Sequence, residues 1–266
     1  MNIYVTNKIS NFTIYNNMET EFSQSISLIN AIENNRSFII SQLLKNGVDT
    51  EVMLNGKNPL IIAVENNHSY NLTKLLEYGA KTEVIFKKKT PLIIAVENNH
   101  SYNLTKLLEY GAKTEVIFEK KTPLIIAVEN NQSYNLTKLL EYGANTEIII
   151  QGKTPLIIAV ENNYLNIVQK LLDYGANPNV VDINSGDSPL FIAVKFNKYS
   201  IVELLLNKNA DLHFYNNDES IFQFIIKNDL TKIINLNKFQ QFLVINDIGN
   251  KYKISECVQN EIYSFL

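Results

Sequence analysis

The sequence predicts an all-α solenoid of paired short helices with projecting loops. The stretch PLIIAVENN occurs four times, and successive copies begin 32 residues apart. Each copy is followed by a second apolar stretch, such as NLTKLLEYGA, that ends on glycine-alanine. Self-similarity at a fixed period of about 20–50 residues is typical of repeat proteins, whose units bury their apolar faces against one another. The four copies begin at Pro59, Pro91, Pro123 and Pro155.

Six repeat units are expected within residues 25–217. Two of them, at 58–89 and 90–121, differ at only two positions. Upstream, SLINAIENN at 27–35 aligns with PLIIAVENN after a shift of 32 residues, which adds a first unit. The remaining three units begin at Thr122, Thr154 and Ser188.

The first helix of each unit is expected to begin at the proline of the repeated stretch. Thr90 precedes Pro91, and a side-chain oxygen at the N-cap followed by proline at N1 is a paired signal for a helix start. Leu60, Ala63 and Val64 then follow at i, i+3 and i+4, which gives one apolar face. The same cap recurs at Asn58, Thr122, Thr154 and Ser188.

A tight turn and a second helix complete each unit. Asn67 ends the first helix, because asparagine tolerates the left-handed conformation that a turn requires. Leu72, Leu75 and Leu76 form the apolar face of the second helix, which ends at Gly79, where a C-cap requires positive φ. The turn asparagine recurs at Asn35, Asn99, Asn131, Asn163 and Asn197, and the capping position at Gly47, Gly111, Gly143, Gly175 and Asn209.

These motifs resemble the ankyrin repeat. The match lies in the period, in the T-P-L opening of the first helix, and in the leucine-leucine followed by glycine-alanine that closes the second. The resemblance covers about 25–217 of this sequence, and it implies a solenoid whose first helices face a concave groove. A tetratricopeptide array would need a period of about 34 residues and a tryptophan-containing pattern, and the chain has no tryptophan.

The sequence departs from the ankyrin pattern in two ways. The histidine after T-P-L is replaced by an apolar residue, so apolar packing is expected to substitute for the hydrogen bonds that the histidine makes between loops. The loops are one residue short except after the fifth unit, where Pro189 lies 34 residues beyond Pro155, and we expect a local irregularity in the superhelix there. The replacing residues are Ile61, Ile93, Ile125, Ile157 and Phe191.

Composition excludes several classes of function. A formal net charge of −3 argues against a nucleic-acid-binding surface. Cys257 is the only cysteine, which excludes an intramolecular disulfide and fits a reducing compartment. The sequence shows no secretory signal and no apolar run of about 18 residues. We expect a cytoplasmic or otherwise intracellular protein, located in the host cell if it comes from a virus or intracellular microbe, with no nucleic-acid or membrane partner.

No catalytic or metal site is expected. His68 and His100 occupy the same repeat position, where the next two copies have Gln132 and Tyr164. Because these residues share no ligand chemistry, we interpret the histidines as turn-capping. No glycine-rich phosphate loop or nucleophile elbow occurs. The chain is therefore expected to be no enzyme, and to take no cofactor, metal or small-molecule substrate.

Glutamates recur near the end of the first helices, on the side that faces the groove in the ankyrin family. Stacked helices lie about 8–10 Å apart, so these carboxylates should form a row of like charges, each pair costing about 0.4 kcal/mol in water. The row is either a solvated face or an acidic groove for a basic partner. Lys195 replaces the glutamate in the sixth unit, after Glu33, Glu65, Glu97, Glu129 and Glu161.

The loops carry an apolar triplet, VIF at 84–86 and 116–118 and III at 148–150. Lysines at 87–89 follow the first triplet. Some of these apolar side chains are expected to brace neighbouring loops, but three in a row would not all be sheltered. An apolar strip with a lysine margin is a plausible contact surface for another protein.

Outside the repeats, 1–24 is assigned to an N-terminal arm or irregular cap. Residues 218–266 are assigned to a degenerate repeat and a C-terminal helical cap that covers the end of the solenoid. Alternatively, 240–266 would dock a second partner such as ubiquitin-ligase machinery, as F-box-like C-terminal segments of many viral ankyrin proteins do.

The resemblance implies a monomeric, non-catalytic scaffold that binds another protein through the concave groove and the loop tips. The alternative is an adaptor, in which the repeats recruit a target and 240–266 docks the second partner. The second and third units present nearly the same surface twice, which recent tandem duplication explains without selection for a ligand. The candidate partner-binding residues are Glu65, Asn66, Ile85, Phe86, Lys88, Glu97, Asn98, Phe118, Glu129, Asn130, Glu161, Asn162, Lys195 and Phe196.

Overall fold

In the computed structural model of the chain, the residues that the structure describes are 22–212, 215–216, 219–221 and 224–225. They form an all-α solenoid of paired helices, as predicted. The chain divides into two compact units, residues 1–127 with 141–143, and residues 128–140 with 144–266.

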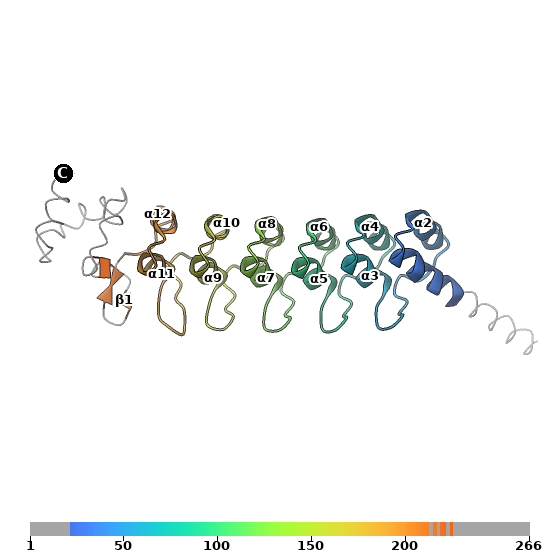
Figure 1. Ribbon diagram of the computed structural model, residues 1–266, viewed down its shortest axis with the longest axis horizontal. Coiled ribbons are helices and arrows are strands. Elements are labelled where there is room, and N and C mark those ends of the chain that lie inside the picture. The colour runs from blue at the N-terminus through green and yellow to red at the C-terminus, as the bar shows by residue number, and fades with distance from the viewer. Residues whose placement is uncertain (1–21, 213–214, 217–218, 222–223, 226–266) are drawn as a thin grey trace, which may run out of the picture. The chain divides into compact units, whose positions relative to one another are not determined.

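The first unit contains three successive helix pairs and the start of a fourth. In Figure 1, α2, α4 and α6 form one layer, α3 and α5 form the other, and the loops project beyond the second layer. Each helix stacks on its counterpart in the next pair, α3 on α5 and α4 on α6. Residues 22–33 are also helical, so this first helix starts ahead of the boundary predicted at residue 25. The other helices are α2 (Ser37–Lys45), α3 (Pro59–Glu65), α4 (Ser69–Glu77), α5 (Pro91–Glu97) and α6 (Ser101–Glu109), followed by the start of α7 (Pro123–Glu129).

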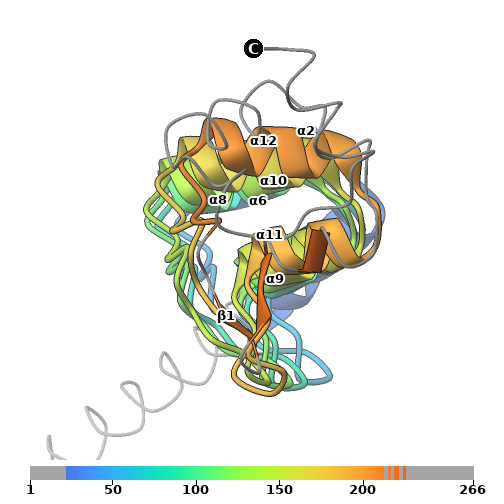
Figure 2. The same ribbon diagram turned by 90° about the vertical axis from the view of Figure 1, so that its left-hand side faces the viewer.

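The second unit repeats this arrangement. Helix α9 pairs with α10 and stacks on α11, while α10 stacks on α12. Figure 2 shows the loops of this unit beyond α9 and α11, on the side away from α10 and α12. The elements are α8 (Ser133–Glu141), α9 (Pro155–Glu161), α10 (Leu165–Asp173), α11 (Pro189–Lys195) and α12 (Tyr199–Asn207), with an antiparallel pair of two-residue strands, β1 (Tyr215–Asn216) and β2 (Glu219–Ser220).

The predicted helix starts and turns are confirmed. The Asn58 side chain accepts a hydrogen bond of 2.9 Å from the Ile61 amide, with proline at N1. Thr90 accepts one of 3.4 Å from the Ile93 amide in the same way. The turn residue Asn67 has φ 55° and the C-terminal Gly79 has φ 86°, both in the left-handed region. Single residue types were therefore sufficient to predict these helix starts, turns and helix ends.

The core consists of the apolar faces that the spacing predicted. Leu60, Ala63, Val64, Leu72 and Leu75 are all fully buried. The isoleucines that replace the family's histidine are at most 1% exposed, so apolar packing takes that place in the stack, as expected. These isoleucines are Ile61, Ile93, Ile125 and Ile157.

The longer loop before α11 adopts its own hydrogen-bonding pattern. The Ile183 amide donates to the Gly152 carbonyl over 2.9 Å, and Asn184 Nδ2 donates to the Gln151 carbonyl over 2.8 Å. Asp182 and Asp187 close the loop through a backbone hydrogen bond of 3.0 Å. The extra length is thus accommodated in the loop, while α11 still stacks on α9.

Three asparagines of the second helices lie in the core. Asn71 is paired, since it donates to Asn35 over 2.8 Å and accepts from Ser37 over 3.0 Å. Asn103 occupies the same repeat position and is fully buried, yet neither polar atom of its carboxamide has a hydrogen-bond partner among the described residues. An unpaired buried amide loses its hydration without compensation. Isoleucine fills this position in the fifth and sixth units, as buried Ile167 and Ile201, and the third asparagine is Asn135.

The predicted C-terminal features fall mostly outside the described residues. These include the segment at 240–266, with both its readings as a cap and as a docking segment, and also His213 and Cys257. Of the degenerate repeat at 218–239, only 219–221 and 224–225 are described. One contact there is clear, since the Phe224 and Phe191 rings meet edge to face with 5.0 Å between centroids.

Replacing Asn103 with isoleucine should stabilise the protein. The substitution removes an unpaired buried amide and inserts the side chain that the fifth and sixth units already accommodate, so the free energy of unfolding should rise by about 1–3 kcal/mol. Urea denaturation followed by circular dichroism measures it. Asn71→Ile is the matched control and should stabilise less or destabilise, because it breaks two hydrogen bonds. Equal gains from both variants would contradict the assignment.

Candidate functional site

The candidate residues lie at two places in each repeat, the end of the first helix and the tip of the preceding loop. Each regular loop closes as a two-residue hairpin through an antiparallel bridge, such as Phe86 to Lys89. Both tip residues have positive φ, which is the geometry of a type I′ turn. The equivalent bridges are Leu54 to Lys57, Phe118 to Lys121 and Ile150 to Lys153.

The hairpin tips differ in how well their residues suit this turn. Asn55 and Gly56, with φ of 53° and 76°, are the residue types that a type I′ turn favours. In the next repeat Lys87 and Lys88 take the same conformation, with φ of 49° and 67°. A left-handed conformation costs most residues about 1–2 kcal/mol. The lysine tips are therefore strained.

The middle residue of each apolar triplet is exposed. Ile85 is 68% exposed, Ile117 65% and Ile149 52%, whereas Val84 and Phe86 on either side of Ile85 are half-buried. The outer residues of the triplets therefore pack within the loops. The middle isoleucines are exposed at the same position of successive repeats.

A lysine connects the helix end of one repeat to the hairpin of the next. Lys57 Nζ lies 2.5 Å from a carboxylate oxygen of Glu65 and 5.0 Å from the centre of the Phe86 ring. Lys89 repeats this arrangement, at 2.7 Å from Glu97 and 4.6 Å from the Phe118 ring. The ion pair joins two groups of one repeat, and the cation–π contact connects that repeat to the next.

The expectation of a row of like charges is wrong. Glu65, Glu97 and Glu161 each pair with a lysine eight residues earlier, the last through Lys153 at 2.7 Å. Each of these three carboxylates is neutralised within its own repeat, so they add no unpaired negative charge to the groove. The signal was present in the sequence, because a lysine stands directly before the helix cap in each of these repeats.

The turn-capping interpretation of the histidines is also wrong. Neither histidine side chain caps the helix that follows it. Instead, Nδ1 of His68 donates to the Ile32 carbonyl over 2.8 Å, and Nδ1 of His100 donates to the Val64 carbonyl over 2.9 Å. In later repeats Tyr164 and Lys198 also reach a backbone carbonyl of the preceding repeat. Different donors can serve at this position because only a hydrogen bond between repeats is required.

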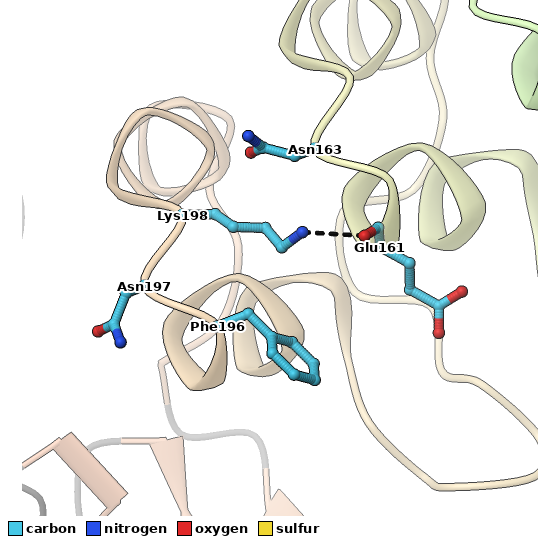
Figure 3. Close-up of a pocket in the computed structure, with 5 residues that line it drawn as sticks. All are labelled: Glu161, Asn163, Phe196, Asn197 and Lys198. Atoms are coloured by element: carbon cyan, nitrogen blue, oxygen red, sulfur yellow. Dashed lines mark hydrogen bonds between the residues drawn. The ribbon is translucent and has the colours of Figure 1, made fainter.

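The sixth unit differs from the others at its helix end. It carries Lys195 and Phe196 where earlier units have glutamate and asparagine, and Phe196 is 60% exposed. Lys195 Nζ lies 3.5 Å from Asp187. Figure 3 shows a pocket here, between the ends of α9 and α11, with a volume of about 380 Å³. Glu161, Asn163, Phe196, Asn197 and Lys198 line it.

The remaining helix-end candidates are available at the surface. Asn66, Asn98 and Asn130 are exposed, and Asn162 is exposed while its side chain donates to the Ile158 carbonyl over 2.9 Å. Within the described part of the chain, no group of three or more His, Cys, Asp or Glu residues could hold a metal ion. None of the described helices is long and apolar enough to cross a membrane.

The opposite face of the repeats, formed by the second helices, has its own pairs. Lys74 Nζ lies 2.6 Å from Glu77 and 5.7 Å from the centre of the Tyr70 ring, which is 54% exposed. The hydrogen bond to Glu77 raises the pKa of Lys74, an ordinary consequence of pairing. The outer face therefore provides a second exposed surface with which the helix ends and hairpin tips can be compared in experiments.

Comparison with known proteins identifies relatives of this fold. A family model described as ankyrin repeats (three copies) matches residues 7–85, 28–118, 69–150, 92–182 and 136–216. A solved ankyrin repeat domain from Acinetobacter baumannii is 26% identical, with a TM-score of 0.63 over 70% of this chain and 98% of that one. The ankyrin repeat domain of Bcl-3, described as a unique member of the IkappaB protein family, is 27% identical, with a TM-score of 0.62 over 73% and 90%. The human ASB11 ankyrin repeat domain is 25% identical, with a TM-score of 0.56 over 74% and 90%. No curated protein matches the chain.

Grafting the first hairpin tip onto the second should stabilise the protein. Lys87→Asn combined with Lys88→Gly replaces two strained residues by the pair at Asn55 and Gly56, so the free energy of unfolding should rise by about 1–2 kcal/mol. Chemical denaturation measures the change. The reverse graft, Asn55→Lys with Gly56→Lys, should destabilise by a similar amount. If neither graft changes stability, the tips are not held in the left-handed conformation.

Proposed function

The chain belongs to the ankyrin repeat family, and from this premise we propose that it binds another protein through its hairpin tips and the ends of its first helices. Ankyrin repeat domains are generally protein-binding scaffolds and are typically non-catalytic. The proposal concerns which surface of this chain makes the contact. Its main support is the exposed isoleucine that precedes each of three hairpins, Ile85, Ile117 and Ile149.

The tip isoleucines suit a contact surface because they are both apolar and preorganised. Ile85 and Ile117 keep about two thirds of their surface in solvent, and each directly precedes a hairpin closed by two backbone hydrogen bonds. A side chain anchored next to a closed hairpin loses less conformational freedom on binding than one on an open loop. Burying it against a partner would gain about 25 cal/mol for each Å² of apolar surface removed from water.

The charges at the hairpin tips differ from one repeat to the next. Lys87 and Lys88 form one tip, so the hairpin that follows Ile85 carries positive charge. In the next hairpin the exposed Glu119 offsets Lys120. The hairpin after Ile85 therefore favours an acidic contact, in contrast to the basic partner that an acidic groove would bind.

The candidate residues accordingly fall into two groups with different roles. Glu65, Phe86 and their counterparts in the next repeat hold the stack together through lysine. Ile85 and Lys88, with the exposed asparagines and Phe196, carry the proposed binding surface. Charge reversal at the glutamates would therefore disturb packing between repeats before it tested recognition.

Replacing the tip isoleucines should abolish partner capture without unfolding the chain. We expect a chain with Ile85→Ser, Ile117→Ser and Ile149→Ser to recover at least tenfold less of each protein that the unaltered chain captures specifically, because the exposed apolar contacts are lost. Affinity purification with quantitative mass spectrometry measures this recovery.

Outer-face substitutions provide the matched control for this experiment. Tyr70→Ser, Tyr102→Ser and Tyr134→Ser remove three exposed apolar side chains from the second helices and should leave capture unchanged. Thermal unfolding verifies that both variants remain folded. Loss of capture with the tyrosine variant, together with retention by the isoleucine variant, would move the binding surface to the outer face.

A further inference from the structure

The sixth unit breaks the repeated surface at three neighbouring positions. Lys195 and Phe196 replace the glutamate and asparagine found at the helix end of earlier units, and Lys198 replaces histidine, glutamine or tyrosine. Earlier units therefore present the same helix-end chemistry several times, and this unit presents a different one. A surface that distinguishes one partner from another requires such a departure.

Two of these replacements, Phe196 and Lys198, line the pocket shown in Figure 3. Two ammonium groups lie near the Phe196 ring, with Lys195 Nζ 5.9 Å and Lys198 Nζ 5.8 Å from its centre. The ring remains 60% exposed. Asn163 and Asn197 add amide groups to the wall of this pocket of about 380 Å³.

The pocket lining contains a lysine that has no ion-pair partner among the described residues. Both carboxylate oxygens of Glu161 are engaged by Lys153 at 2.7 Å. Lys198 donates to the Glu161 backbone carbonyl over 2.9 Å, which leaves its charge uncompensated, and its ammonium forms no ion pair among the described residues. Lys195 has a carboxylate of Asp187 at 3.5 Å, and its own side chain is 45% exposed.

We propose that this pocket binds a segment of the partner protein in which an acidic side chain neighbours an aromatic or aliphatic one. The carboxylate would pair with Lys198, and the apolar side chain would pack on the exposed Phe196 ring. A pocket of this volume lies at the lower end of ligand sites, about 300–1,000 Å³, so it suits one or two side chains. This inference rests on the proposed protein-binding function and names the chemistry that the partner must supply.

A protein segment fits these groups better than other anionic ligands. Lys198 is the one cation in the described lining of the pocket, so it matches the single carboxylate of a peptide better than the successive charges of a phosphate backbone, and a peptide places that carboxylate at a fixed distance from an apolar side chain. Aromatic side chains are also common among the anchor residues that dominate protein interfaces. Nucleic acid is therefore an outcome to be tested and not the proposed ligand.

A display library tests the inference directly. Random peptides displayed on phage are selected on the full chain, and in parallel on a chain with Phe196→Asn and Lys198→His. This double variant recreates residues that the second unit carries as Asn66 and His68, so it should fold with an unchanged unfolding midpoint. We expect the full chain to enrich peptides with Asp or Glu beside Phe, Tyr, Leu or Ile, and these peptides to bind the double variant about thirtyfold more weakly.

The contrary outcomes separate the inference from the function on which it rests. Peptides that bind both chains equally would overturn the pocket and leave protein binding intact, since they would then bind elsewhere on the solenoid. A chain that retains no peptide above an empty support would count against both proposals. A fluorescein-labelled single-stranded oligothymidylate serves as the last probe. If it binds the full chain and not the double variant, the pocket belongs to a nucleic acid.

Discussion

Burial of each helix pair against the next is the constraint on which this structure depends. Helix α3 has seven residues and α4 has nine, and helices this short are not stable alone. Every residue of α3 except Glu65 is buried, because its neighbours in the stack cover it from both sides. A first helix therefore has almost no side chain left for recognition. The residues available for binding are therefore the last ones of the helix and those of the hairpins, which project beyond the stack.

The sequence predicted the parts of this fold that depend on one residue and its immediate neighbours. Threonine before proline identified the helix starts, and Asn67 and Gly79 identified backbone positions with positive φ. Contacts between repeats were harder to predict. The hydrogen bond from His68 to the Ile32 carbonyl spans 36 residues of sequence, and the contact of Lys57 with the Phe86 ring depends on how two loops stack. Periodicity shows that repeats are adjacent, but it does not show which polar atoms meet.

The same contacts change the expected character of the candidate site. Counted by residue type, the helix ends are acidic, but pairing with lysine neutralises Glu65, Glu97 and Glu161. Near-identical repeats also present near-identical surfaces. Such repeats extend the length of the binding surface but contribute little to distinguishing one partner from another. The sixth unit, with Phe196 and Lys198, is where the described surface departs from the repeated pattern.

Amide hydrogen exchange of the full chain, alone and bound to the protein that it captures, tests most directly whether binding uses the hairpins and helix ends and not the outer helices. Peptides from near-identical repeats still report their position within the repeat, so hairpin tips and outer helices can be distinguished. Slower exchange on binding at 84–89, 116–121 and 195–198, with no change in α4 and α6, is the predicted result. Protection confined to α4 and α6 would show that the partner binds the outer face, and would contradict the account.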